Sequence, residues 1–198
     1  MKKLMIAALL CAAPAYAETV NGLRTVDEFD SIENESERSV AYFEEMLQVI
    51  EHPRCLNCHP VDNSPRQGDD MALHQPPVVR GEADFGAPGM RCTTCHASEN
   101  VAFETGDGSI PGHTPWQFAP ISMGWIGLSG AEICAQIKDP ERNGNRTLAE
   151  LHEHNAEDGL VGWGWEPGEG REPAPGNQEI FGALTQAWID TGAACPGS

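Results

Sequence analysis

The chain has 198 residues, and its 30 aspartates and glutamates outnumber its 12 lysines and arginines, giving a formal net charge of −18 at pH 7. Such acidity argues against nucleic acid or an anionic membrane surface as a partner, because both would repel the protein. The length favours one domain of modest size, and 21 glycines and 15 prolines predict long loops between short helices.

The first 17 residues have the pattern of an export signal. Lys2 and Lys3 precede an apolar stretch over residues 4–13, and Ala15-Tyr16-Ala17 offers the small residues of a cleavage site. The apolar stretch is too short to span a bilayer, and no later segment is a candidate membrane span. We therefore predict a signal peptide at residues 1–17, a mature chain of residues 18–198 and a periplasmic location.

The first predicted helix leads directly into a Cys-x-x-Cys-His pentapeptide. Asn34 and Glu37 resemble a capping box, and apolar residues recur at helical spacing as far as about residue 51. Pro53 can begin a further helical turn, which carries the pentapeptide at residues 55–59, and Pro60 ends it. The sequence thus predicts a short, sharply ended turn at this motif.

The pentapeptide occurs twice, as Cys55-Leu56-Asn57-Cys58-His59 and as Cys92-Thr93-Thr94-Cys95-His96. Cys-x-x-Cys-His is the signature of covalent c-type haem attachment, in which both thiols bond to the porphyrin and the histidine binds the iron. On one helical turn the three side chains share a face. We therefore predict two covalently attached haem c groups, bound by Cys55, Cys58, Cys92 and Cys95, with His59 and His96 as proximal iron ligands.

The rest of the chain alternates loops with three further helices. Residues 60–91 and 159–176 are rich in glycine and proline, and residues 97–128 have no sustained periodicity. Capping residues Ser129 and Thr147 begin two helices, and a last one runs from about residue 178 to 191. The prediction is a mainly α fold with extensive loops and little or no β-sheet, forming a single small cytochrome c-like domain with two haems as its scaffold.

The second axial ligand of each haem decides what the iron can do. Two protein ligands favour electron transfer, whereas a vacant position permits binding of small molecules. His74 stands beside two prolines that stiffen its segment, and His154 falls near the buried side of a predicted helix. We rank the candidates as His74, His154, His113 and then Met123, and the sequence leaves open which ligand serves which haem.

Two cysteines remain once the haem motifs and the signal peptide are set aside. Cys134 and Cys195 form an even remainder, which in an oxidising compartment indicates a disulfide. It would close a loop of about 60 residues and stabilise the fold by roughly 4 kcal/mol. Two buried, unpaired thiols are the alternative.

Four further segments suggest a family: residues 112–116 (GHTPW), 133–140 (ICAQIKDP), 160–168 (LVGWGWEPG) and 187–196 (AWIDTGAACP). With the two haem motifs, they make the chain resemble a group of bacterial exported di-haem proteins often labelled as isoquinoline oxidoreductase subunits. The resemblance implies that redox proteins are the partners, with a molybdenum hydroxylase-type dehydrogenase as a candidate donor. Any molybdenum chemistry would belong to that other chain, so the resemblance supplies no catalytic residue here.

Three interpretations follow. The first is a periplasmic di-haem c-type cytochrome that transfers electrons between a dehydrogenase and a respiratory acceptor, rather than a stand-alone enzyme. The second is a haem enzyme or small-ligand-binding protein with one open iron. The third is structural zinc, although the separation between Cys58 and Cys92 exceeds compact zinc spacings and each cluster has an added histidine.

Overall fold

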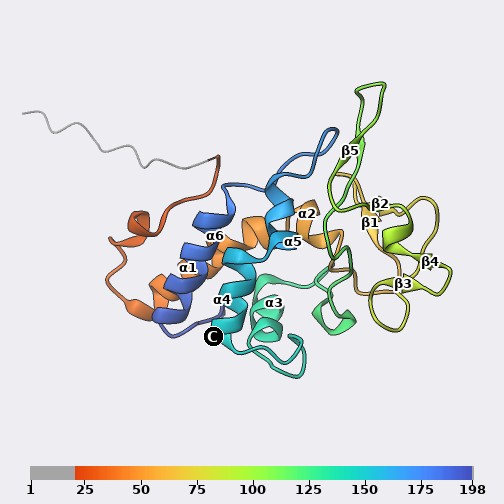
Figure 1. Cartoon of the computed structure of the whole chain (residues 1–198). Coiled ribbons are helices and arrows are strands. Elements are labelled where there is room, and N and C mark those ends of the chain that lie inside the picture. The colour runs from red at the N-terminus through yellow and green to blue at the C-terminus, as the bar shows by residue number, and fades with distance from the viewer. Residues whose placement is uncertain (1–20, 198) are drawn as a thin grey trace, which may run out of the picture.

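The computed structural model describes residues 21–197, and most of its helices lie on one side of the molecule (Figure 1). The helices are α1 (Glu35–Ile50), α2 (Pro53–Leu56), α3 (Gly130–Ile137), α4 (Leu148–Glu157), α5 (Gly159–Gly162) and α6 (Gln178–Asp190), with 3-10 turns η1 (Val26–Phe29), η2 (Cys92–Thr94), η3 (Ile121–Met123) and η4 (Trp163–Trp165). The predicted mainly α fold with extensive loops is confirmed. The predicted signal peptide at residues 1–17 lies outside the described residues.

Side-chain caps fix where the longer helices begin. The Asn34 side chain accepts hydrogen bonds from the first-turn amides of α1, and Ser129 and Thr147 each form a reciprocal capping box with a glutamate three residues on. Residues 159–176, predicted as loop, contain α5 and η4 instead. Asp158 explains the difference, because its carboxylate accepts a hydrogen bond from the backbone amide of Leu160 and caps α5.

The hydrophobic core lies among α1, α3, α4 and α6. The rings of Phe43 on α1 and Trp188 on α6 have centroids 5.2 Å apart. A Cβ on Gly182 of α6 would lie 2.6 Å from the Cβ of Ala156 on α4, so glycine permits these helices to approach closely. The predicted disulfide between Cys134 and Cys195 is confirmed, with an S–S distance of 2.04 Å, and it ties α3 to the segment that follows α6.

Residues 57–118, here called the loop segment, fold differently. They contain three antiparallel pairs of two-residue strands: β1 (Arg66–Gln67) with β2 (Ala72–Leu73), β3 (Gly86–Ala87) with β4 (Met90–Arg91), and β5 (Val101–Ala102) with β6 (Ser109–Ile110). These hairpins lie together beside the helices (Figure 1). None of their residues belongs to the main core cluster within the described chain, so the loop segment has little apolar interior of its own.

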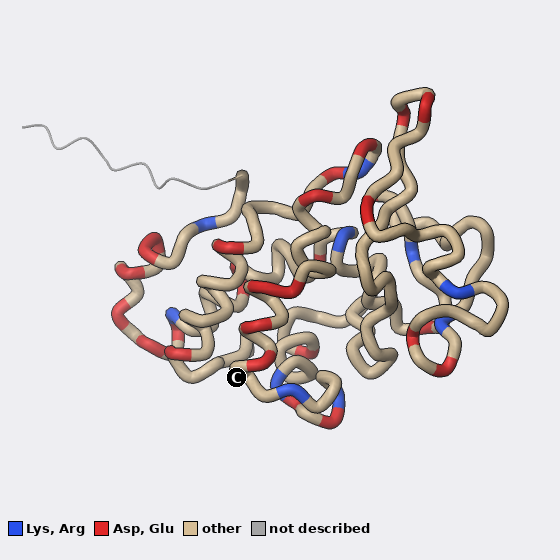
Figure 2. The backbone as a smooth tube through the Cα atoms, in the orientation of Figure 1, with Lys and Arg blue, Asp and Glu red and all other residues tan. Residues whose placement is uncertain are grey.

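The described residues are mostly acidic among their charged positions, and their helices include no candidate membrane span. Acidic positions greatly outnumber basic ones along the described chain (Figure 2). Within residues 21–197, no helix combines the length and the apolar character that crossing a membrane requires.

Candidate haem sites

The first Cys-x-x-Cys-His motif forms a helical turn at the end of α2. Pro53 is the first residue of α2, and the His52 side chain caps it by accepting from the amide of Arg54 at 3.3 Å. The turn continues past Leu56, because the backbone amides of Cys58 and His59 both donate to the carbonyl of Cys55 at 3.1 Å. Both thiols and the imidazole are thereby brought to one place, as the sequence predicted for this motif.

The motif borders a cavity that the helices enclose. The cavity has an empty volume of about 1070 Å³, counted with the open solvent at its mouth. Its walls include apolar side chains from four helices, namely Ile50 of α1, Ile137 of α3, Leu151 of α4 and Phe181 of α6. The candidate residues that line it are Cys55, Cys58, His59, Met123 and His154.

Two contacts orient the ring of His59. Its Nδ1 lies 2.7 Å from the carbonyl oxygen of Met123, so Nδ1 carries the proton and Nε2 keeps a free lone pair. Its ring stacks on Trp125, with centroids 3.5 Å apart and planes 7° from parallel. Gly124 permits this approach, since a Cβ there would lie 2.8 Å from the carbonyl oxygen of Pro60. Burial lowers the pKa of His59 to about 3, so the imidazole is neutral, as a metal ligand must be.

The two thiols of the first motif are held in their neutral form. Burial raises the pKa of Cys55 to about 12 and that of Cys58 to about 11. Both residues keep some accessible surface, and that surface borders the cavity. Thioether sulfurs bonded to a porphyrin would likewise carry no charge in this buried environment.

His154 stands in the wall of the same cavity. Its Nδ1 lies 3.0 Å from Oδ2 of Asp158, one helical turn later, and this contact leaves Nε2 free. The hydrogen bond to His154 is the main reason that the pKa of Asp158 is lowered to about 2. A carboxylate behind an imidazole is the usual partner of a ligating histidine, because it fixes the ring orientation.

The second motif repeats the proximal arrangement of the first. The Nδ1 of His96 lies 2.6 Å from the carbonyl oxygen of Pro111, which again leaves Nε2 free. The ring stacks on Trp116, with centroids 4.7 Å apart and planes 13° from parallel. Burial lowers the pKa of His96 and favours the neutral imidazole. The two motifs therefore share a backbone acceptor for Nδ1 and a tryptophan against the ring.

His74 lies next to His96, with ring centroids 6.0 Å apart and planes at 61°. Its Nδ1 is 2.9 Å from the carbonyl oxygen of Pro76, so both histidines have Nε2 available. At this separation the two imidazoles would be close enough to bind one iron. The structure thus brings His74 to the second motif, a pairing that the sequence left open.

His113 and Met123 are the two lower-ranked candidates, and of these only Met123 lines the first cavity. The Nε2 of His113 packs against α5, at 2.6 Å from the position that a Cβ on Gly159 would take. Its Nδ1 faces the carbonyl of Pro115 at 3.3 Å. Met123 supplies the carbonyl behind His59, which puts its backbone on the proximal side of the first site. Met123 and His154 both line the first cavity, and His154 has its Nε2 free.

The surroundings of the two sites differ. Cys92 is half-buried and Cys95 is exposed, so the second site opens to solvent, whereas the helices enclose the first. Large apolar side chains that are exposed in the described residues all lie between positions 61 and 121, close in sequence to the second motif: Val61, Leu73, Val79, Phe85, Met90, Val101, Phe103 and Ile121.

Backbone hydrogen bonds and an aromatic contact join the two sites. The amide of Ala119 donates to the carbonyl of Cys58 at 3.1 Å, and the next residue back, Phe118, donates to Asp84 at 3.0 Å. Trp116, which stacks on His96, meets Trp163 edge to face at 4.9 Å, and Trp163 lines the first cavity. The two motifs are therefore neighbours, although 32 residues separate their facing ends in sequence.

The residues present fit two haem c groups. Each motif offers two thiols and a neutral histidine with a free Nε2, and each has a second histidine nearby that is held in the same way. No group of three or more histidines, cysteines, aspartates or glutamates within residues 21–197 is arranged to hold a bare metal ion. Haem iron does not need such a group, because the porphyrin supplies the other four ligands.

Sequence reasoning missed several residues of the sites. Trp125 and Trp116 carried no specific signal, since tryptophans in a small domain most often build the core. Asp158 has the i,i+4 spacing from His154 that favours a contact on a helix, and this spacing could have identified it.

Comparison of the chain with models of protein families, with curated proteins and with solved structures found no match.

Proposed function

We propose that the chain is a periplasmic di-haem c-type cytochrome that transfers electrons between a dehydrogenase and a respiratory acceptor. The observation that carries the proposal is the matched setting of His59 and His96. Each follows two cysteines, donates Nδ1–H to a backbone carbonyl and stacks on a tryptophan. This arrangement fixes the tautomer and the direction of Nε2, as iron ligation requires.

The axial pairs follow from the neighbours of these two histidines. His59 and His154, which line the same cavity, would bind the first iron, and His96 and His74, whose rings are in contact, would bind the second. When bound, haem supplies a one-electron couple between ferric and ferrous iron. A hydrogen bond at Nδ1 holds each of the four imidazoles in its orientation, so little rearrangement need accompany a change of oxidation state.

The charge of the chain supports a protein partner with a basic docking surface. A net charge of −18 steers a positively charged surface toward the cytochrome and speeds encounter. The exposed second motif would meet such a partner at short range. The family resemblance points to a molybdenum hydroxylase-type dehydrogenase as donor, and a respiratory electron carrier would be the acceptor.

The alternative function is small-ligand binding or catalysis at one open iron, and one observation favours it at the first site. Among residues 21–197, His74 and His96 form a ring contact, whereas no ring contact joins His59 to His154. A first haem without His154 as ligand would offer a vacant position inside an enclosed cavity. The test of the axial pairs also decides between these two functions.

Spectroscopy of the mature, haem-loaded protein tests the proposal. A pyridine haemochrome assay should give two haems c per chain, and metal analysis should give no zinc. Low-temperature paramagnetic resonance of the oxidised protein should show two low-spin signals. His74→Ala should abolish one signal in favour of a high-spin signal, and His154→Ala should do the same to the other.

His152→Ala is the matched control, because His152 lies on α4 beside His154 and is not among the residues that line the cavity. It should leave both signals unchanged. A high-spin signal that accounts for one whole haem per chain in the unaltered protein, with immediate binding of cyanide or carbon monoxide, would favour the open-iron alternative. Two low-spin signals that both survive His74→Ala and His154→Ala would refute the axial pairs.

A further inference from the structure

Arg54 is a buried cation in the wall of the first cavity. Its side chain is 0% exposed, and it lies directly before Cys55 on α2. One guanidinium nitrogen, Nη2, contacts Oδ1 of Asp69 at 2.5 Å. The other two, Nε and Nη1, are buried without a hydrogen-bond partner in the described part of the chain. A buried guanidinium with unmet donors is costly, so its position calls for a role.

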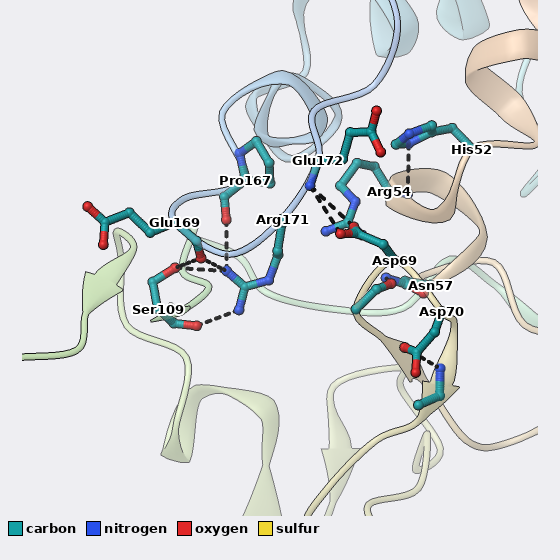
Figure 3. A network of polar contacts seen from close by, with 12 residues as sticks. His52, Arg54, Asn57, Asp69, Asp70, Ser109, Pro167, Glu169, Arg171 and Glu172 are labelled. Atoms are coloured by element: carbon teal, nitrogen blue, oxygen red, sulfur yellow. Dashed lines mark hydrogen bonds and ion pairs between the residues drawn. The ribbon is translucent and has the colours of Figure 1, made fainter. Parts of the chain in front are cut away.

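The counter-charge of Arg54 is incomplete. Asp69 is 46% exposed, so water screens its carboxylate. The same carboxylate is shared with the backbone amide of Glu172, at 3.3 and 3.4 Å (Figure 3). The positive charge therefore lies inside the protein, on the cavity side, while the negative charge lies at the surface. The pair leaves a net positive potential in the cavity.

We propose that Arg54 raises the reduction potential of the first haem relative to that of the second. The proposal rests on the proposed function and goes further, because it gives the electron a preferred position within the chain. Oxidation of the iron adds one positive charge to the site. A fixed cation in a poorly solvated cavity disfavours that charge and so favours the ferrous state.

The matched axial ligands make this difference meaningful. Both irons would have two histidines, and both proximal histidines donate to a backbone carbonyl and stack on tryptophan. The contributions of ligand identity and of proximal hydrogen bonding to the reduction potential are therefore the same for the two haems. Burial, nearby charge and the partners of the second histidines, the Asp158 carboxylate behind His154 and the Pro76 carbonyl behind His74, remain as the terms that separate their potentials.

Other arginines near the sites are better neutralised or better solvated. Arg146 also lines the first cavity, but it is only partly buried, whereas the Arg54 side chain is fully buried. Arg80 donates to the carboxylate of Asp84 and to the carbonyls of Pro60, Asp62 and Ala119. Arg171 interacts electrostatically with His96. Its guanidinium donates hydrogen bonds to Ser109 and to the carbonyl of Pro167 (Figure 3). The second site is also open to water, which screens the charge of Arg171. Arg54 thus acts mainly on the first haem.

Redox titration of the haem-loaded protein tests the proposal, with each haem followed by its own low-spin signal. Arg54→Gln should lower the midpoint potential of the first haem and narrow its separation from the second. Arg54→Lys, which keeps the charge, should preserve most of the separation. Asp69→Asn removes the counter-charge and should raise the potential of the first haem.

The opposite signs of the shifts distinguish electrostatics from structural damage. Loosening of the cavity would move the potential in the same direction in Arg54→Gln and in Asp69→Asn, and that result would overturn the proposal. Arg142→Gln removes an exposed arginine and should leave both potentials unchanged. If Arg54→Gln does not accumulate, Asp69→Asn decides alone: a raised potential supports the proposal, and an unchanged or lowered one refutes it.

Failure of the inference is distinct from failure of the proposed function. Two haems c with low-spin signals and no shift in Arg54→Gln would leave the cytochrome intact and remove only the role of Arg54. A pyridine haemochrome assay without haem c would remove both.

Discussion

Removal of the disulfide should weaken the part of the fold that encloses the first cavity. Cys134 and Cys195 are 61 positions apart, and cross-linking a loop of this length stabilises the folded state by about 4 kcal/mol in the chain-entropy description. Replacing both residues by alanine should therefore lower the unfolding midpoint by about 8–16 °C for a chain of this size. Two hydrogen bonds persist in the variant, from Lys138 Nζ to the carbonyl of Ala193 and from Trp188 Nε1 to that of Ala194.

Thermal unfolding of the oxidised, haem-loaded protein, followed by circular dichroism, measures this loss. Replacing both cysteines by serine is the control, because it opens the disulfide with side chains of nearly the same size and leaves the haem iron oxidised. The structure also predicts where the effect is felt. Ile137 on α3 and Phe181 on α6 line the first cavity, so the low-spin signal of the first haem should be lost on heating before that of the second. A loss of stability below about 1 kcal/mol, or earlier loss of the second signal, would refute the reasoning.

Two further predictions concern the position of His154. Asp158→Asn should destabilise the protein above pH 3.8, because the folded-state pKa of Asp158 is lowered to about 2 and its charged form therefore stabilises the fold. The difference in stability between the variant and the unaltered protein should shrink as the pH falls from 3.8 toward 2, since protonation of Asp158 removes that stabilisation. Denaturant unfolding of both proteins across this range measures the difference, and a difference that stays constant would contradict the prediction. Gly182→Val should push α4 away from α6, cost about 1–3 kcal/mol and weaken the first low-spin signal, because a Cβ there would lie 2.6 Å from Ala156 Cβ. Ala183→Val, at the next and exposed position, is the control, and equal effects of both variants would show that helix spacing is not the cause.

The sequence predicted those features that depend on nearby residues. Caps at Asn34, Ser129 and Thr147 are local contacts, so the starts of α1, α3 and α4 followed from composition and spacing. The disulfide followed from counting cysteines, because only Cys134 and Cys195 remained unassigned. Both motifs were likewise visible, since covalent haem attachment needs its residues within one turn.

Features that depend on how the loops fold back could not be predicted. The strands of the loop segment have two residues each, too few for alternation of side chains to show in a sequence. The position of His74 depends on contacts such as its own amide with the carbonyl of Pro65 and that of Arg80 with Asn63. Arg54 gave no signal either, because arginine beside a motif is expected at the surface.

A repeated local pattern connects the two sites. His74 follows His59 by 15 residues, and His113 follows His96 by 17; each is two residues before a proline whose carbonyl faces its Nδ1, at 2.9 and 3.3 Å. The histidine of the first repeat nevertheless lies against His96 of the second. The second site therefore needs both repeats to fold, whereas the first draws its opposite wall from α4. Damage to residues 60–73 should consequently disturb the second haem more than the first, even though the first motif is nearer in sequence.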